Sequence, residues 1–546
     1  MKSFKTCVKG LLLIMKPLRL QMLLSVLIGL LRIASSLAFV WICKRLVDIV
    51  TGQAISSGPD RLAGAVFVMA GIVAVQIISA IAGQWWTAYI TVNAQNRMRF
   101  ETFSHVLRSK WYGRELFHSG DMINRLEEDI RVLVDLICTR IPDVAITLSQ
   151  LLAASLYLFS MAPGLLWTLL IIMPAAIIGS RMFFVTLRKL SNRVRELDSE
   201  VQKQMQENLQ QRALVLTLGA ASKIIERLGG TQQELKSTTI KRLNYNAVAR
   251  AFLRIGFMGT YIAAFLWGIY GIKSGNVTYG MMTAFLQLVG QVQRPIAEIS
   301  QHIPAFIHSL TSIERILELQ ELKEEKNEPD NVFEGSAGVR ISDMTYSYPD
   351  GPVEVFKHFS FDFKPGSTCA ITGITGAGKS TLIKLILALL EPDEGRIEIY
   401  GNGKTADVSP ATRCNFMYVP QGNSLMSGTI RENLMLADRN AGEEEMKAAL
   451  HIAVADFVEE LPKGLDTFCS EKGGGLSEGQ AQRIAIARAL LHKGGVLILD
   501  EASSALDLQT EGELLRRMTQ AASGRTIIWI THRDAITKMA DNTLNI

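Results

Sequence analysis

The first part of the chain alternates long apolar runs with strongly charged segments. Six of these runs predict helices that cross a membrane, because about 20 apolar residues span the hydrocarbon core of a bilayer. The predicted spans cover residues 22–42, 62–89, 141–161, 165–178, 253–272 and 281–292. The fourth is short and continues through residues 181–185, and the sixth is the weakest because Gln287 and Gln291 interrupt it. An amphipathic run over residues 4–16, stopped by Pro17, is typical of a helix that lies on a membrane surface.

The charges of the connecting segments predict which side of the membrane each one faces. Segments 97–140 and 181–254 are long and rich in lysine and arginine, whereas 161–164 is uncharged and 273–280 is nearly so. Because lysine and arginine are retained on the cytoplasmic side, the two long segments and both termini are predicted to be cytoplasmic. Six spans satisfy this pattern and five do not. The mixed-charge segment 43–61 must then be external, and it fits least well.

The two long cytoplasmic segments are highly charged, almost free of proline and prone to form helices. The second to fifth spans are therefore predicted to continue as helices into the cytoplasm, each pair joined by a short turn. The candidate turns lie at residues 111–117 and 215–222. They are places where a cytoplasmic motor domain would push on the membrane domain. A plain cytosolic helical hairpin is the alternative, favoured only if no ATPase module follows.

Several polar side chains lie within the predicted spans. Arg32 is in the middle of the first span, where a buried cation is costly, so it should face a cavity or a partner. Gln76 in the second span and the glutamines of the sixth can do the same. Two interpretations stay open for these groups, namely contact with a substrate and hydrogen bonding between helices.

The composition indicates membrane topology rather than nucleic-acid binding. Across 546 residues the chain is 48% hydrophobic with a net charge of +5, and its lysines and arginines cluster beside the apolar runs. The six cysteines are scattered without a CxxC pair, which predicts free thiols and no cysteine metal site. The first 20 residues contain too short an apolar stretch for a removable signal peptide.

The composition changes after residue 317, where a charged segment broken by proline predicts a linker over 318–335. Within residues 336–546, helix-prone runs alternate with strand-like runs at 339–341, 367–372, 396–400, 415–419, 495–499 and 526–530. This alternation predicts an α/β nucleotide-binding domain. The predicted fold class is therefore a multidomain membrane protein, with an all-α transmembrane domain of six long helices over 1–317 and an α/β P-loop domain over 336–546.

A glycine-rich stretch stands between a predicted strand and a predicted helix, which is the order that a phosphate-binding loop requires. Its glycines let the backbone turn tightly and bring its N–H groups close to phosphate oxygens. Lys379 is predicted to pair with the β- and γ-phosphates of ATP, and the Ser380 hydroxyl to hold Mg²⁺. The residues of this loop predicted to bind ATP are Gly373, Thr375, Gly376, Ala377, Gly378, Lys379, Ser380 and Thr381.

Two carboxylates follow a short apolar run further along the chain. Four apolar residues that end in Asp500 and Glu501 are typical of a fully buried strand. Asp500 is expected to reach Mg²⁺ through water, and Glu501 is placed to polarise the water that attacks ATP. An apolar strand ending in two acids is weak evidence alone, and strong evidence together with the phosphate loop.

The stretch Leu476-Ser-Glu-Gly-Gln480, followed by a helix-prone run, closely resembles the signature motif of ATP-binding cassette (ABC) transporters. The resemblance implies that Tyr348 stacks on adenine and that Gln421 contacts Mg²⁺ and senses the membrane domain. It implies that His532 contacts the γ-phosphate and that Asp507 belongs to the D-loop. The expected catalytic residues are then Glu501, His532 and Gln421, and the expected Mg²⁺-binding residues are Ser380, Gln421 and Asp500.

In this family an ATP site forms between two cassettes, so one chain alone is not the expected working unit. The resemblance implies that Ser477, Gly479 and Gln480 of one chain approach ATP held by the phosphate loop of another. A homodimer is the simplest expectation, because one chain holds both halves of the site, and a heterodimer is the alternative. Glu478 stands where the family usually has glycine, and its carboxylate is expected to slow closure. The chain also ends soon after His532, where relatives usually continue through another strand and a helix.

The resemblance covers nearly the whole chain and implies an exporter-type half-transporter of the type IV kind. It implies ATP-driven export, or flipping between leaflets, of a hydrophobic or amphipathic substrate by alternating access, with ATP and Mg²⁺ bound. Expected partners are membrane lipid and a small-molecule, lipid or peptide substrate, with no nucleic acid. The expected location is a bacterial inner membrane, with the cassette in the cytoplasm. The alternative is a nucleotide-gated regulator or channel, against which the intact Glu501 argues, and the spans exclude a soluble cassette.

Overall fold

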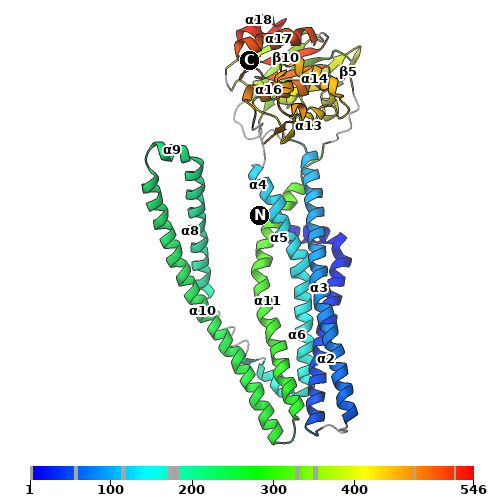
Figure 1. The fold of residues 1–546 in the computed structure, drawn as a ribbon, viewed down its shortest axis with the longest axis vertical. Coiled ribbons are helices and arrows are strands. Elements are labelled where there is room, and N and C mark those ends of the chain that lie inside the picture. Colours follow the sequence, from blue (N-terminus) through cyan, green and yellow to red (C-terminus); the bar gives the residue numbers. More distant parts are fainter. Residues whose placement is uncertain are drawn as a thin grey trace. The chain divides into compact units, whose positions relative to one another are not determined.

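The computed structural model describes residues 4–546 apart from 54–58, 112–118, 170, 173–183, 326–331, 334, 349–353, 375, 471–474 and 522–523. The chain divides into two compact units. The first comprises Met1–Glu101 and Asn124–Glu318, and the second comprises Thr102–Ile123 and Leu319–Ile546. Helices build the first unit, whereas the second contains the β-sheets and the helices that cover them (Figure 1).

The helices of the first unit follow the predicted apolar runs. The short helices α1 (Phe4–Met15) and η1 (Lys16–Leu18) come first. The long helices follow, in the order α2 (Arg19–Val50), α3 (Pro59–Arg108), α6 (Ile141–Met161), α10 (Ala221–Lys273) and α11 (Tyr279–Gln320). Four short helical segments lead into α6, namely α4 (Ser119–Asn124), η2 (Arg125–Asp129), α5 (Ile130–Asp135) and η3 (Leu136–Arg140). Because they join end to end, residues 119–161 form one nearly continuous helical rod.

Four helical stretches among the described residues are long and apolar enough to cross a membrane: Lys9–Val50, Leu62–Arg108, Asp121–Met161 and Ala221–Lys273. They contain the first, second, third and fifth predicted spans. The predicted fourth span lies partly outside the described residues. The sixth lies in α11, where glutamines reduce the apolar character of the helix. The total of six spans therefore stays a prediction.

Two clusters of buried side chains hold the long helices together. One cluster joins α2, α3, α5 and α11 through residues that include Ile90, Leu133 and Ile316. The other joins α2, α6, α10 and α11 around Leu158 and Phe285. These clusters fix which faces of α2, α3, α6 and α11 are turned toward one another.

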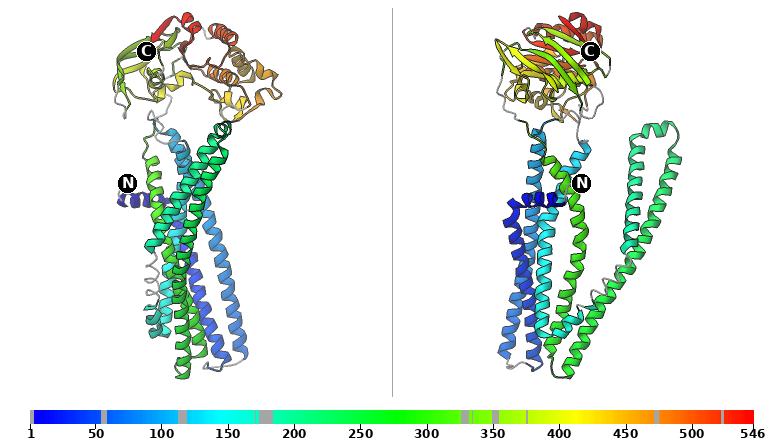
Figure 2. Two further views of the ribbon diagram at one scale, coloured as in Figure 1. Left: turned by 90° about the vertical axis from the view of Figure 1, so that its left-hand side faces the viewer. Right: turned by 180° about the vertical axis from the view of Figure 1, so that it is seen from behind.

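The described part of the predicted cytoplasmic segment 181–254 is helical apart from Gln211 and residues 218–220. α8 (Phe184–Gln210) packs along α10, and α9 (Arg212–Thr217) closes the hairpin between them (Figure 2). α9 buries none of its own residues. The turn between the two helices thus begins at Arg212, slightly before the predicted 215–222. The other predicted turn, 111–117, lies outside the described residues except for Trp111.

The second unit contains an antiparallel sheet in the order β2-β1-β4-β5 and a parallel sheet in the order β11-β3-β10-β9-β6. The strands are β1 (Gly338–Ser347), β2 (Glu354–Phe363), β3 (Thr368–Thr372), β4 (Glu394–Gly401), β5 (Lys404–Asp407), β6 (Phe416–Val419), β9 (Val496–Asp500), β10 (Thr526–Ile530) and β11 (Asn542–Asn545). A separate pair joins β7 (Gly428–Thr429) to β8 (Phe468–Cys469). The six strand-like runs predicted from the sequence coincide with β1, β3, β4, β6, β9 and β10.

Helices cover the parallel sheet and form a second core beside it. They are α12 (Lys379–Ile386), α13 (Ile430–Met435), α14 (Glu443–Ile452), α15 (Phe457–Glu460), α16 (Glu478–Leu491), α17 (Leu508–Ala521) and α18 (Asp534–Met539). One buried cluster lies between the two sheets and α12, and another packs α13, α14, α16 and α17 against the parallel sheet. The five described cysteines are free thiols, as predicted.

The end of α3 belongs to the second unit because it is bonded to the start of the linker. The Lys110 N–H donates to the Lys323 carbonyl at 2.8 Å, and the Glu325 N–H donates to the Arg108 carbonyl at 2.8 Å. Trp111 packs against the core between the sheets. Contacts between distant parts of the chain thus group residues 102–123 with the second unit. The predicted domain boundaries, 1–317, 318–335 and 336–546, stay predictions.

Candidate active site

The phosphate loop, the acidic pair and the predicted switch histidine gather at one edge of the parallel sheet. β3, β10 and β9 lie next to one another and run in the same direction, with Ile371 opposite Ile530 and Ile530 opposite Asp500. The carboxyl ends of parallel strands meet at a common edge, where open α/β sheets bind their ligands. The phosphate loop, His532 and the acidic pair are therefore brought together, although they are far apart in the sequence.

The phosphate loop follows β3 and leads into α12, as predicted. Gly373, Gly376 and Gly378 have φ angles of 146°, 90° and 102°, which side chains rarely tolerate. A Cβ atom on Gly378 would lie only 2.8 Å from the Val355 Cγ1 atom, so space as well as conformation requires glycine. Thr375 lies outside the described residues. The backbone N–H groups of Ala377 and its neighbours thus precede a helix N-terminus, an arrangement that suits phosphate.

The Lys379 side chain is buried and bonded within the loop. Its Nζ atom donates to the Gly373 carbonyl at 2.6 Å and to the Ile374 carbonyl at 3.1 Å, and it lies 3.3 Å from His532 Nε2. The ammonium group therefore stands between the loop and the histidine that the sequence assigned to the γ-phosphate. Ser380, the next residue, is exposed.

Tyr348 lies just beyond β1 and reaches the start of α12. Its hydroxyl is 3.0 Å from the Thr381 hydroxyl, and its ring meets the Tyr346 ring edge to face at 5.3 Å. Burial raises the pKa of Tyr346 to about 12, so this neighbour is a neutral phenol. The structure thus places the predicted adenine-stacking residue beside the phosphate-binding helix, with one ring already packed against it.

The three expected catalytic residues meet at Glu501. The Gln421 side-chain amide donates to Glu501 Oε2 at 2.7 Å, and His532 Nε2 lies 3.7 Å from Glu501 Oε1. Glu501 has a φ of 49°, in the left-handed region, and its N–H donates to the Ile530 carbonyl at 3.0 Å. A strained backbone of this kind persists only where its surroundings hold it, and such residues are concentrated at functional sites.

Asp500 is buried beside this group, at 5% exposure. Burial raises the pKa of Asp500, and the charge of Glu501 raises it further. The Tyr418 hydroxyl donates to Asp500 Oδ2 at 3.4 Å, and burial strongly raises the pKa of that phenol, which keeps it neutral. Sequence reasoning missed Tyr418, because only the parallel pairing of β6 with β9 brings it to Asp500.

The signature residues form a separate group at the start of α16. Ser477 is the N-cap, accepting a hydrogen bond from the Gln480 N–H at 3.2 Å, and its own N–H donates to Gln480 Oε1 at 2.9 Å. A Cβ atom on Gly479 would lie 2.9 Å from the Ala505 carbonyl. Glu478 is the exposed first residue of the helix. Among the described residues, no hydrogen bond joins this group to the phosphate loop.

The D-loop segment 503–507 lies between the signature helix and the switch region. Asp507 caps α17, accepting from the Thr510 N–H at 2.9 Å. Arg533, beside the predicted switch histidine, donates to the Ser504 and Leu506 carbonyls at 3.1 and 3.3 Å. Sequence reasoning did not single out Arg533, since no motif marked its reach back to this segment. The contacts tie the positions of His532 and the D-loop to each other.

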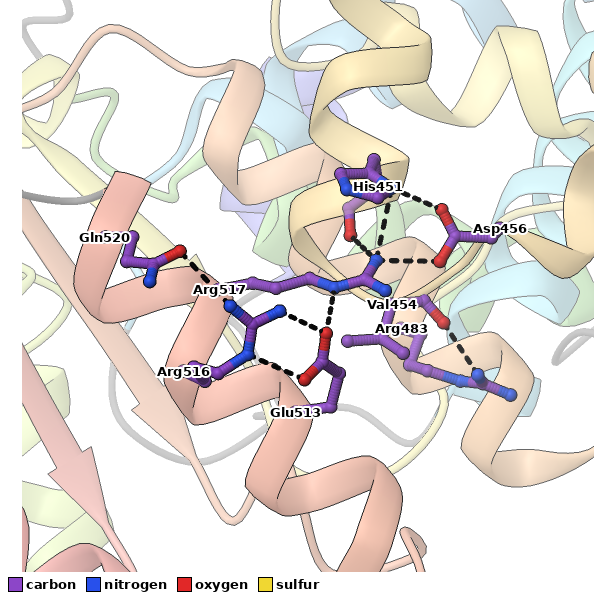
Figure 3. A network of polar contacts seen from close by, with 8 residues as sticks. All are labelled: His451, Val454, Asp456, Arg483, Glu513, Arg516, Arg517 and Gln520. Atoms are coloured by element: carbon purple, nitrogen blue, oxygen red, sulfur yellow. Dashed lines mark hydrogen bonds and ion pairs between the residues drawn. The ribbon is translucent and has the colours of Figure 1, made fainter.

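A network of ion pairs joins α17 to the end of α14 and the segment that follows it (Figure 3). Arg517 donates to Asp456 Oδ2 at 2.7 Å and to Glu513 Oε1 at 2.7 Å. Hydrogen bonds from Arg516 and Arg517 lower the pKa of Glu513 to about 2. Beside the network, Arg483 of the signature helix donates to the Val454 carbonyl at 2.7 Å. One hydrogen bond thus joins α16 to the segment after α14.

Known proteins resemble both halves of the chain. Residues 22–296 match the ABC transporter transmembrane region, and residues 356–504 match the ABC transporter family of cassette domains. An ATP-dependent lipid A-core flippase of Desulfotalea psychrophila is 30% identical over 450 residues, which cover 81% of this chain and 78% of that protein. A putative multidrug export ATP-binding/permease protein of Bacillus subtilis is 26% identical over 548 residues, covering 97% and 94%.

A solved structure has the same overall fold. A bacterial Atm1-family ABC exporter with ATP bound superposes with a TM-score of 0.78 at 25% identity, covering 97% of this chain and 93% of that one. The helical transmembrane domain and the α/β nucleotide-binding domain predicted from the sequence are thereby confirmed, as is transport coupled to an ATPase. The chain belongs to the ABC transporter family, as a multi-pass membrane protein of the exporter-type half-transporter kind.

Proposed function

We propose that this protein exports an amphipathic or hydrophobic substrate, or flips it between leaflets, by ATP-driven alternating access. The cassette would lie in the cytoplasm, at the inner membrane of a bacterium. Relatives named as a lipid flippase and as a multidrug exporter support this substrate range. The long helices of the first unit support a membrane path for it.

One observation carries the proposal, namely the meeting of Gln421, Glu501 and His532 beside the phosphate loop. Glu501 would polarise the attacking water, with Gln421 fixing its carboxylate by the 2.7 Å hydrogen bond. His532 would contact the γ-phosphate. Lys379 would leave its two loop carbonyls for the β- and γ-phosphates, which attract the ammonium more strongly because they are charged.

The residues around Asp500 suit Mg²⁺, which prefers oxygen ligands. Ser380, Gln421 and Asp500 would hold it, with an exposed hydroxyl, an amide oxygen and a buried carboxylate. Burial raises the pKa of Asp500, and Mg²⁺ bound beside it would lower that pKa again by favouring the ionised carboxylate. When bound, Mg²⁺ would neutralise charge on the phosphates.

We further propose that two copies of the chain form the working unit. Ser477, Gly479 and Gln480 would face ATP held by the other copy, since Ser477 and Gln480 bond to each other rather than to their own phosphate loop. Asp507 would adjoin the same interface. The α9 turn supports the proposal, since it exposes Leu214 and Leu216 at 52% and 61% and needs a surface to cover them.

The direct test is ATP hydrolysis by the purified chain in lipid nanodiscs, compared with Glu501→Gln. The wild type should turn over, and the variant should bind ATP with turnover reduced at least about a hundredfold, as expected for loss of a general base. Glu444→Gln, at an exposed position on α14, is the matched control and should keep the wild-type rate. ATP binding without turnover in the wild type would instead favour a nucleotide-gated regulator or an obligate different partner.

A further inference from the structure

A polar cavity of about 540 Å³ lies within the first unit, lined by residues of α2, α3, η3, α6 and α11. Figures 1 and 2 show the long helices among these side by side. Charged and amide side chains line most of it, and those of α2, α3, η3 and α6 belong to helical stretches long and apolar enough to cross a membrane. Ionisable groups at such positions are costly and tend to be functional. The lining includes Arg32, Gln76, Arg140, Asp143, Gln291 and His302.

The charges of the cavity leave one cation without a bonded partner. Three arginines and two carboxylates line it, an excess of one positive charge. Arg294 pairs with Glu298 at 2.7 Å, and Arg140 pairs at 2.9 Å with Asp135, which is outside the lining. The Arg32 guanidinium forms no hydrogen bond or ion pair with any residue that the structure describes, although the Arg32 carbonyl accepts one from Ser35.

Asp143 lines the same cavity as Arg32, Arg140 and His302, and it lies close enough to interact electrostatically with all three. No hydrogen bond or ion pair joins Asp143 to Arg32 among the described residues, so the donor groups of the Arg32 guanidinium stay available. An anion brought into the cavity would be attracted to this guanidinium.

Two buried polar atoms of the lining also have no hydrogen-bond partner among the described residues. The Gln291 amide donates to the Ser36 hydroxyl at 2.9 Å, but its Oε1 atom has no partner among the described residues. Nor does Nδ1 of His302, a side chain only 9% exposed. Gln76, by contrast, is engaged by a bond from its amide to the Ser35 carbonyl at 3.0 Å. Buried polar atoms are almost always paired, so the unused ones indicate hydrogen bonds to something that enters the cavity.

We propose that this cavity binds an anionic group of the transported substrate, a carboxylate or a phosphate, that is flanked by hydrogen-bonding groups. The proposal rests on the proposed function, since it assigns the chemistry of what is transported. Arg32 makes the charge-assisted bonds to the anion, and Gln291 and His302 bond the flanking polar groups. A purely apolar molecule would shield all of these groups from water without offering them hydrogen bonds, which costs free energy. A cation would be repelled by the three arginines.

Binding by the full-length chain in phosphatidylcholine nanodiscs tests the proposal, with empty nanodiscs correcting for partitioning. The probes are dodecyl phosphate, dodecyltrimethylammonium with the same tail and opposite charge, and butyl phosphate with a short tail. Dodecyl phosphate should bind at least about tenfold more tightly than the cation, the usual worth of one charged hydrogen bond. Tight binding of butyl phosphate would identify a small solute, and its failure to bind would identify an amphiphile, while either result supports an anionic ligand.

The variants separate the role of Arg32 from general effects of charge. Arg32→Gln should weaken dodecyl phosphate binding about tenfold, and Arg32→Lys should restore part of it. Arg45→Gln is the matched control on the same helix, because Arg45 lies over the Trp41 ring rather than in the cavity lining. Equal binding of the two probes with opposite charge, or unchanged binding by Arg32→Gln, would overturn the proposal. Because no nucleotide is present, a chain without ATPase activity would count against the proposed function and leave this result intact.

Discussion

Replacing Arg413 with alanine should weaken the attachment of the linker to the cassette. The Arg413 guanidinium makes two bonds to Glu325, at 2.6 and 2.9 Å, and two more to the Leu387 and Ala388 carbonyls, at 2.8 and 2.5 Å. Glu325 also donates its N–H to the Arg108 carbonyl at the end of α3. The Arg413 side chain therefore joins the linker to the residues that follow α12, and the Glu325 backbone joins the linker to the end of α3.

The size of the expected destabilisation follows from the burial of the ion pair between Arg413 and Glu325. Removing one partner of a buried ion pair costs about 3–5 kcal/mol, because the other charge is left without compensation. The Glu325 side chain is only 9% exposed, but that of Arg413 is 26% exposed, so solvent reduces the loss. We expect a loss of about 2–3 kcal/mol in the free energy of unfolding of the cassette unit, discounted for screening.

Thermal unfolding of the full-length protein, followed by tryptophan fluorescence, measures this loss. For a unit of this size, about 2–3 kcal/mol lowers Tm by roughly 5–10 °C. Arg396→Ala is the matched control, since its ion pair with Glu398 is 3.5 Å long and its side chain is 66% exposed, and it should shift Tm little. Adding Glu325→Gln to Arg413→Ala should recover part of the loss by removing the stranded charge. An Arg413→Ala protein that unfolds within about 1 °C of the wild type would refute the reasoning.

Three further predictions concern the ATP site. Tyr418→Phe removes the hydrogen bond that lowers the pKa of Asp500, so the ATPase rate should begin to fall at a higher pH on acidification than in the wild type, and coincident pH profiles would contradict this. Glu478→Gly should raise the ATPase rate if the exposed carboxylate slows closure onto ATP, and an unchanged rate would end that idea. Gly378→Ala should weaken ATP binding at least about tenfold, because strain of about 1–3 kcal/mol arises at its positive φ, whereas Gly512→Ala, with open space around its Cβ, should bind normally.

Local patterns were sufficient to predict most of the cassette. The phosphate loop, the buried strand that ends in Asp500 and the signature helix each depend on neighbouring residues, so their sequence alone predicts them. β2 was missed because no motif marks it, although Phe359, Phe361 and Phe363 alternate with polar residues as in a half-buried strand. The ATP-site roles assigned to Ser477 and Asp507 stay predictions, because within one chain both residues serve as helix caps.

Contacts between distant residues account for what the sequence left out. The pairing of Lys110 with Lys323 moves the end of α3 into the cassette unit, and no composition change announces it. The lining of the cavity likewise could not be predicted from the sequence alone. Arg32 and Gln76 stand out as polar residues within apolar runs, but which faces of four helices meet depends on tertiary packing. His302 therefore joined the site only in the folded structure.

The central claim is that each ATP site is built from two copies of the chain, and ATP retention by a mixed dimer tests it most directly. In a Glu501→Gln background, Lys379→Ala should disable the phosphate loop of one copy, and Ser477→Arg should disable the signature of a differently tagged copy. Either variant alone should retain no ATP after gel filtration. The mixed dimer, purified through both tags, should retain about one ATP, because one intact loop then faces one intact signature. A mixed dimer that forms but retains no ATP, or retention by the Ser477→Arg protein alone, would contradict the account.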